Sequence, residues 1–194
     1  MPSKYINTHR VCCGQTKISG FSIVESVIVL SIIAILIMTS VPSFSKFITE
    51  TEIKNVSYNL STSLNLARQY AISHSIPVHL CGLKSIKSIE CHYNTDFNSN
   101  WSYGWIVFAD KNDNNQYDES EPLINVVQNA RNVNVVFNQR GRLRFFQDGS
   151  ARSAGFYLCK QTAIENRHIR LLYSGRARVS KSMTEKQQLI CNSV

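Results

Sequence analysis

The stretch GFSIVESVIVLSIIAILIMTSVP, from Gly20 to Pro42, is almost wholly apolar and decides how the first part of the chain folds. Between Ile23 and Val41 it is about long enough to cross a bilayer as a helix, since ~20 residues span ~30 Å of hydrocarbon. Glu25 lies near its start, where a carboxylate in lipid costs about 2.5 kcal/mol or more and usually has a function. The stretch therefore predicts a membrane-spanning helix whose carboxylate needs a partner.

Residues 1–20, which precede the apolar stretch, are polar and carry Lys4, Arg10 and Lys17. Positive charges before a membrane helix keep the N-terminus in the cytoplasm. A secretory signal peptide begins in the same way, but it is cut after its apolar region at a small-residue site. No such site followed by polar sequence precedes Pro42, so we expect the apolar stretch to remain in the mature protein.

The residues around Gly20 resemble the class III signal of type IV pilins and pseudopilins. Gly20, Phe21, Glu25 and Pro42 all fall in the register of that family, together with the apolar stretch between them. The resemblance implies that a prepilin peptidase cuts after Gly20. It also implies that the new amino group of Phe21 is methylated and that Glu25 serves filament assembly.

Filament assembly would give Glu25 the partner that it needs. The α-amino group of Phe21 is a cation once cleavage has created it, and Glu25 of a docking subunit can neutralise it. A paired charge in a low dielectric costs far less than a lone one. Alternatively, Glu25 snorkels at the cytoplasmic end of the span in the free subunit. The two interpretations can hold at different stages.

Beyond Pro42 the apolar residues recur every three or four positions, which is the spacing of one buried helix face. They are Ile53, Val56, Leu60, Leu64, Ala67 and Ala71. We expect one helix from about Ser22 to about His74, kinked at Pro42. The rest of the chain predicts short strands separated by Gly, Asn and Asp. They are Val78–Cys81, Trp105–Ala109, Leu123–Val127, Val133–Asn138, Arg142–Phe146, Gly155–Cys159, Ile169–Tyr173 and Arg176–Val179.

The pilin resemblance implies an α+β fold class, with a long N-terminal helical spine packed on an antiparallel β-sheet head. We expect residues 1–20 to be a leader peptide and residues 21–44 to be the transmembrane and filament-core half of the helix. Residues 45–194 would form the globular periplasmic or extracellular domain. The protein would then cross the inner membrane once, and later lie in a pilus or pseudopilus at the cell surface.

Four cysteines remain after the expected cleavage, and an even number in an exported domain favours disulfides. Of the three possible pairings we favour Cys81–Cys91 and Cys159–Cys191, because each pair brackets a plausible loop. The rival is a zinc site with His79 and His92, but the spacing contains no C-x₂-C element.

The stretch DKNDNNQYDESE, from Asp110 to Glu121, has the spacing of an EF-hand calcium loop. Its oxygen-bearing residues at the usual ligand positions are Asp110, Asn112, Asn114, Gln116, Asp118 and Glu121. Asn115 replaces the usual central glycine, and asparagine tolerates a positive φ better than most residues. The flanking segments look like strands rather than helices, so a polar hairpin loop is the alternative. Calcium is the one cofactor that the sequence suggests.

The C-terminal third of the chain is strongly basic. Residues 131–194 contain twelve Lys or Arg against three Asp or Glu, in a chain of net charge +8. Two G-R-x-R tetrads occur there, Gly141–Arg144 and Gly175–Arg178. Residues two apart share one face of a strand, so each tetrad would present two guanidinium groups that can bridge phosphates. A solvated basic face without a partner is the alternative.

The segment FYLCKQTAIENRHIRLLYSGRARV, followed by a final cysteine, resembles the FimT-type minor pilins of the GspH/FimT group. The resemblance implies DNA binding through Gly175, Arg176 and Arg178 during uptake for natural transformation. The residues Arg142, Arg144 and Lys181 would extend this patch. The expected partners are other major and minor pilins, the prepilin peptidase, DNA and, before assembly, the inner membrane.

The alternative function is structural, in a type II secretion pseudopilin or in a minor pilin that does not bind DNA. Such a subunit needs no basic face. An enzyme is not expected, because the histidines and carboxylates form no recognisable triad and the motif G-x-S-x-G is absent.

Overall fold

The computed structural model describes residues 20, 22–93, 97–129, 133–161 and 166–192, and only the backbone of residues 39–43. The chain divides into two compact units, residues 1–41 and residues 42–194. We call the second unit the head. Helix α1, Ile23–His74, begins in the first unit and continues into the head. The expected kink at Pro42 falls on residues whose side chains lie outside the description.

In the first unit, the apolar side chains of α1 from Ile23 to Met38 are exposed. Glu25 is also exposed and lies in the first turn of the helix. Within the described residues, no helix reaches the length and apolarity needed to cross a membrane. Of the expected leader and cleavage site, only Gly20 is described; residues 1–19 and Phe21 lie outside the described residues.

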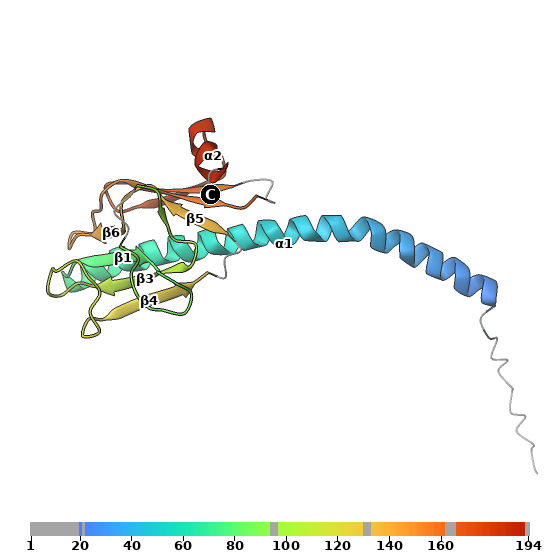
Figure 1. Ribbon diagram of the computed structural model, residues 1–194, viewed down its shortest axis with the longest axis horizontal. Helices are drawn as coiled ribbons and strands as arrows, with labels where there is room; N and C mark the ends of the chain where they lie inside the picture. The colour runs from blue at the N-terminus through green and yellow to red at the C-terminus, as the bar shows by residue number, and fades with distance from the viewer. Residues whose placement is uncertain (1–19, 21, 94–96, 130–132, 162–165, 193–194) are drawn as a thin grey trace, which may run out of the picture. The chain divides into compact units, whose positions relative to one another are not determined.

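The strands of the head form two antiparallel sheets (Figure 1). The four-stranded sheet has the order β4 (Leu123–Gln128), β3 (Gly104–Ala109), β1 (Val78–Gly82) and β6 (Arg142–Phe145). The five-stranded sheet has the order β2 (Ser99–Asn100), β5 (Asn134–Phe137), β7 (Ala154–Cys159), β8 (Arg167–Leu171) and β9 (Ala177–Ser180). A short helix, α2 (Glu185–Asn192), follows β9 and contacts β7.

The second half of α1 supplies the apolar stripe on which the core of the head forms. The fully buried residues of this stripe are Ile53, Leu60, Leu64, Ala67 and Ala71. They belong to one cluster with side chains of both sheets, such as Trp105 and Phe156. Removal of apolar surface from water contributes about 25 cal/mol per Å², so this shared cluster is the main reason that both sheets pack on one helix.

Ser63 links α1 to the four-stranded sheet at a buried position on the helix. Its Oγ accepts the indole N–H of Trp105 at 2.9 Å and the side-chain N–H of Asn125 at 3.0 Å. The hydroxyl itself donates to the backbone carbonyl of Asn59 at 2.9 Å. One serine therefore accepts hydrogen bonds from the buried indole of Trp105 and from the amide of the half-buried Asn125.

The structure contains two disulfides, Cys81–Cys91 and Cys159–Cys191. This is the pairing that the sequence favours. The first joins β1 to the loop that follows it. The second joins the end of β7 to α2, so the last helix is covalently attached to the five-stranded sheet. Because the sulfur atoms of Cys81 and Cys91 are bonded to each other, the rival zinc site with His79 and His92 has no thiolate ligands.

The expected α+β fold is confirmed, and a strand occurs at each of the eight expected positions. The structure differs from the expectation in having two sheets instead of one. Strand β2 was not expected, because it has only two residues. Helix α2 was not expected either, because Cys191 is its single buried residue and the sequence shows no apolar stripe there.

Replacing Ser63 with Ala should lower the free energy of unfolding by about 2 kcal/mol, because the Trp105 and Asn125 donors lose their acceptor inside the protein. Chemical denaturation of the full chain measures this change. The control is Ser61→Ala on the same helix, since the Ser61 Oγ is buried and has no hydrogen-bond partner in the part of the chain that the structure describes. A loss of equal size in both variants would show that Ser63 does not hold helix and sheet together in this way.

Candidate functional site

The second G-R-x-R tetrad lies in the hairpin between β8 and β9. Gly175 has a φ of 73°, and its N–H donates to the carbonyl of Leu172 at 2.9 Å, which closes the turn. Strand pairing places Arg170 of β8 directly opposite Arg178 of β9. Ile169 and Leu171 are buried in the core, so the intervening Arg170 faces away from it, and Arg178 shares that outward face.

Arg68 of α1 holds this hairpin against the helix by hydrogen bonds. Its Nε donates to the carbonyl oxygens of Gly149, at 3.2 Å, and Ser174, at 3.1 Å. A side chain on Gly175 would collide with the carbonyl of Gly149 and would meet Arg68. The glycine of the tetrad therefore contributes by letting two hairpin turns approach each other, and its position beside the two arginines follows from packing.

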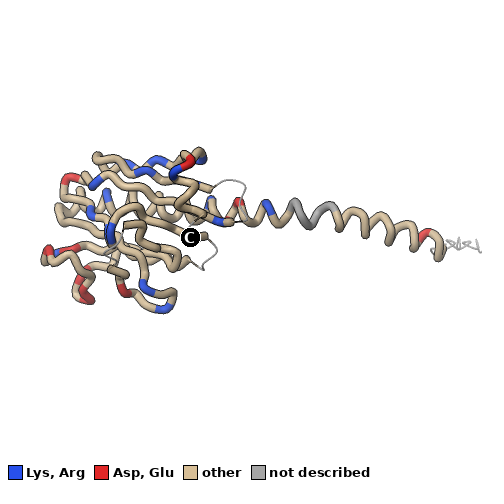
Figure 2. Tube along the Cα trace, turned by 45° about the horizontal axis from the view of Figure 1, so that its top comes forward, with Lys and Arg blue, Asp and Glu red and all other residues tan. Residues whose placement is uncertain are grey.

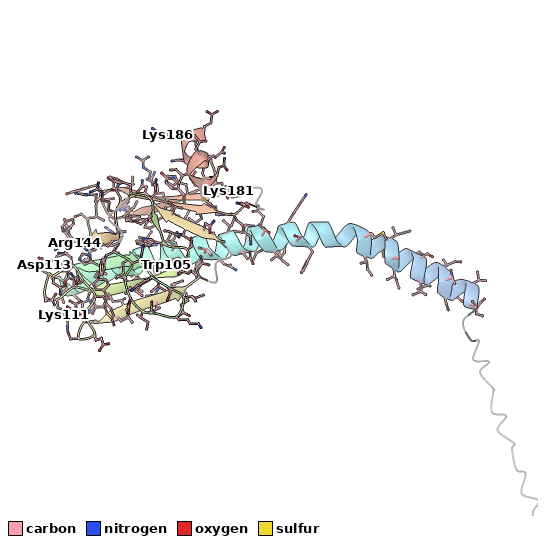
Figure 3. The ribbon with its side chains drawn as sticks, viewed as in Figure 1. Trp105, Lys111, Asp113, Arg144, Lys181 and Lys186 are labelled. Carbon is pink, nitrogen blue, oxygen red and sulfur yellow. A yellow bond between two sulfur atoms is a disulfide. The ribbon has the colours of Figure 1, made fainter. Side chains whose placement is uncertain are left out.

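The arginines of this hairpin are exposed and are not neutralised by the part of the chain that the structure describes. Arg170, Arg176 and Arg178 are exposed, and none of them forms an ion pair with a described carboxylate. Lys181 lies on the segment leading to α2 and Lys186 on α2 itself, next to the five-stranded sheet (Figure 3), and Figure 2 shows several Lys and Arg positions on the head. We call Arg170, Arg176, Arg178 and Lys181 the hairpin surface.

His168 borders the hairpin surface in a shallow hollow of about 270 Å³ that Arg170 also lines. Its ring stacks on Tyr157 with centroids 5.0 Å apart. Burial lowers the pKa of His168, and the charge of Arg170 lowers it further. The imidazole is therefore neutral near pH 7, and the positive charge of this surface comes from arginine and lysine.

The first tetrad lies on β6, in the other sheet, and its arginines have different neighbours. The guanidinium of Arg144 donates to Asp113 Oδ1 at 2.7 Å and to Asn115 Oδ1 at 3.2 Å. The guanidinium carbon of Arg142 lies 5.8 Å from the centre of the Tyr93 ring. The structure therefore does not merge the two tetrads into one strand face, and the charge of Arg144 is partly compensated.

Arg142 and Arg144 line an open hollow of about 550 Å³ that the sequence did not reveal. Arg140 and Arg152 line it as well, together with the aromatic rings of Phe97 and Phe146. The guanidinium of Arg140 lies 4.4 Å from the ring centre of Phe97. We call this the arginine hollow. Phe97 was missed because it lies far from the tetrad in sequence. Phe146 and Arg152 lie close to the tetrad but were missed because no local motif links them to it.

His79 lies between the arginine hollow and the acidic loop. It pairs across the sheet with Phe108 on one side and with Arg144 on the other. Burial lowers the pKa of His79 to about 4; Asp110 acts against this effect, while Arg144 and Arg142 strengthen it. His79 is therefore a neutral, buried group at pH 7 and adds no charge to the hollow.

The acidic loop, residues 110–121, connects β3 to β4 and folds around its own side chains. The N–H groups of Asn114 and Gln116 donate to the side-chain oxygens of Asn112 and Asn114, at 3.1 Å and 2.7 Å. Asp118 accepts amide N–H groups from Asn112 at 2.8 Å and from Asn114 at 2.7 Å. Among the described residues, no group of three His, Cys, Asp or Glu side chains is arranged to hold a metal ion.

Comparison with known proteins gives one matching family model and two similar solved structures of a single protein. The family model described as type II transport protein GspH matches residues 58–175. Two crystal structures of the type IV minor pilin FimU of Pseudomonas aeruginosa are similar to this chain. One has 14% identity and a TM-score of 0.47, over 66% of this chain and 91% of FimU. The other has 16% identity and a TM-score of 0.49, over 69% and 92%.

A search of curated protein sequences finds no match. The family match, by contrast, covers more than half of the chain, from the middle of α1 through both sheets to Gly175 at the turn before β9. The chain therefore belongs to the GspH family of type II transport proteins, which confirms its expected place in the GspH/FimT group of pilin-like proteins.

Proposed function

We propose that this GspH-family protein is a filament subunit whose head binds DNA non-specifically through the hairpin surface, for uptake in natural transformation. Assembly would follow the pilin route, with a single-pass stage in the inner membrane, cleavage after Gly20 and association with other pilins. One observation carries the DNA part of the proposal, namely the outward-facing and uncompensated arginines of β8, β9 and their turn. The family match ends at Gly175, so Arg176 and Arg178 support the proposal by their surroundings and not by the match.

The cross-strand pairing of Arg170 with Arg178 favours an anionic partner. Like charges that lie directly opposite each other on a sheet destabilise it, by up to about 1 kcal/mol. A phosphate placed between the two guanidinium groups would turn this repulsion into two attractive contacts, each of them a charge-assisted hydrogen bond. Arg176 and Arg178, two residues apart, would extend such contacts along the hairpin.

The arginine hollow offers a second class of contact, suited to single-stranded stretches of DNA. Arginines interleaved with exposed aromatic rings, such as Phe97 and Phe146, are typical of surfaces that hold single-stranded nucleic acid. Phosphates would meet Arg140, Arg142 and Arg152, and bases would stack on the rings. Neither kind of contact reads a base sequence, so we expect binding without sequence preference.

The second candidate function is that of a structural pseudopilin in type II secretion, which the description of the family model favours. Such a subunit would use α1 and the head for filament contacts and would leave the arginines solvated. The alternative accounts for the helix, the sheets and the disulfides equally well. It gives no reason for the close approach of Arg170 and Arg178.

Replacing Arg176 and Arg178 with Gln should weaken DNA binding by about tenfold or more at moderate salt. Each lost phosphate contact also removes about 0.9 from the slope of log affinity against log salt, so the slope should fall by about 2. The measurement is a fluorescence titration of labelled duplex DNA with the full chain in mild detergent, at several salt concentrations.

The matched control is the double variant Lys84→Gln, Lys87→Gln, which removes the same net charge from an exposed loop outside the hairpin. Lys84 forms an exposed ion pair with Glu90, so its loss should cost little stability. Equal weakening by both double variants would mean that overall charge drives binding. Unchanged binding by the arginine variant would exclude the hairpin surface.

We also propose that Glu25 neutralises the amino terminus of a neighbouring subunit during assembly. Its exposed position in the first turn of α1 supports this role, because an exposed carboxylate is accessible to a cation of another subunit. Glu25→Val should then prevent incorporation into filaments, measured by immunoblotting of sheared filaments from cells. The neighbouring exposed variant Ser26→Val should assemble, and normal incorporation of Glu25→Val would contradict the charge pairing.

A further inference from the structure

We propose that the acidic loop binds one calcium ion, with Asp110, Asn112, Asn114, Asp118 and Glu121 as side-chain ligands. These residues hold positions 1, 3, 5, 9 and 12 of the loop, which are ligand positions in an EF-hand, and the carbonyl of Gln116 would supply position 7. The set consists of oxygen atoms alone, as a hard cation requires. Three of the ligands are carboxylates, which supply negative charge for a divalent ion. Because no three acidic side chains of the described residues are yet arranged to hold a metal, the proposal requires the ion to draw these carboxylates together.

The strongest indication of a ligand is one oxygen of Asp110. The side chain of Asp110 is fully buried, yet its Oδ1 has no hydrogen-bond partner among the described residues. Its other oxygen, Oδ2, accepts the N–H of Asn115 at 2.9 Å and lies 3.2 Å from His79 Nε2. Because Asn115 lies halfway round the loop, this hydrogen bond turns the carboxylate into the loop. A buried carboxylate oxygen without a donor is costly, and a bound cation would satisfy it.

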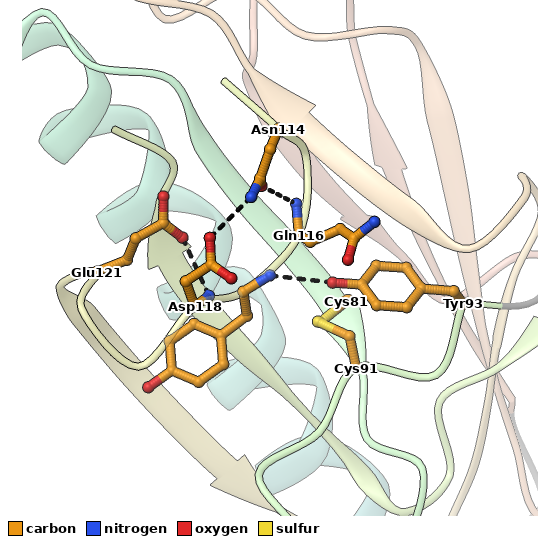
Figure 4. Close-up of a disulfide and its surroundings, with 8 residues drawn as sticks. Cys81, Cys91, Tyr93, Asn114, Gln116, Asp118 and Glu121 are labelled. Atoms are coloured by element: carbon orange, nitrogen blue, oxygen red, sulfur yellow. Dashed lines mark hydrogen bonds between the residues drawn. A yellow bond between two sulfur atoms is a disulfide. The ribbon is translucent and has the colours of Figure 1, made fainter. Parts of the chain in front are cut away.

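The remaining carboxylates are held at the other end of the same loop (Figure 4). Glu121 is buried, and its two oxygens accept the N–H groups of Lys111 at 2.9 Å and Asp118 at 3.3 Å. These bonds fix the carboxylate but leave further lone pairs on both oxygens, which a bidentate ligand needs. Asp118 has two side-chain amides on one oxygen, and those amides belong to the ligand residues Asn112 and Asn114.

The central turn also fits the ion-binding loop. The EF-hand uses glycine at position 6 for a sharp turn, and here Asn115 adopts a φ of 63°. The loop is bounded by strands β3 and β4 instead of helices, so its ends are held by a sheet. An oxygen set of this number on a flexible loop suits calcium better than magnesium, which needs near-ideal octahedral geometry.

The site borders the arginine hollow but does not depend on it. Asp113 and Asn115, which are not among the proposed side-chain ligands, hold the guanidinium of Arg144. An ion that orders the loop would therefore also fix Arg144. Calcium binding itself rests on the loop residues alone, so it stands or fails independently of DNA binding.

Isothermal titration of calcium chloride into the metal-free full chain tests the proposal directly. We expect one saturable site, and Glu121→Gln should weaken it by at least about tenfold, because it removes the bidentate ligand. The matched control is Glu119→Gln, an exposed carboxylate of the same loop at a position without ligand function, which should bind as the wild type does. Absence of saturable binding, or equal weakening in both variants, would overturn the proposal.

A second variant is needed because Glu121 is buried and accepts two backbone N–H groups. A folding defect in Glu121→Gln would otherwise be mistaken for loss of a calcium ligand. Asn112→Ala with Asn114→Ala removes two ligands from exposed positions. Calcium should raise the thermal unfolding temperature of the wild type and of Glu119→Gln, and chelator should reverse the rise. The double variant should lose the rise. A rise of equal size in the double variant would show that calcium binds elsewhere.

Discussion

The head depends on the burial of one narrow stripe of α1 against two sheets. The small side chains of Ala67 and Ala71 let residues of both sheets pack closely on the helix. Arg68, beside them, donates hydrogen bonds to carbonyl oxygens in two hairpin turns. Once Ile169 and Leu171 are directed at the helix, the two-residue period of a strand sends Arg170 outward. The basic character of the outer face thus follows from where the core must lie.

The two G-R-x-R tetrads show how far a short motif depends on its surroundings. In the first, Arg144 meets Asp113 and an amide of the acidic loop, so its charge supports that loop. In the second, Arg178 meets another arginine across the sheet and no described carboxylate. Identical four-residue patterns therefore have different electrostatic environments. In the second tetrad neither arginine has a described carboxylate partner, whereas in the first Arg144 does.

Much of the fold could be predicted from the sequence, because α1 and most strands have a clear apolar period. The disulfide pairing could be favoured from loop lengths alone. Two sheets in place of one could not be predicted, since strand order depends on contacts between segments far apart, such as β1 with β6. The same reason hid the arginine hollow, whose residues come from separate loops and strands. Helix α2 is mostly polar and is held to the sheet through the disulfide of Cys191. Its sequence therefore lacks the apolar periodicity from which a helix is predicted.

DNA capture by a filament subunit is best tested in cells that lack the chain. Transformation frequency should fall in the deletion strain and return with the wild-type gene. It should not return with Arg176→Gln, Arg178→Gln, although that variant should still enter filaments. Full recovery with the arginine variant would contradict a role for the hairpin surface in uptake. Unchanged transformation in the deletion strain, together with lost protein secretion, would instead establish the structural pseudopilin.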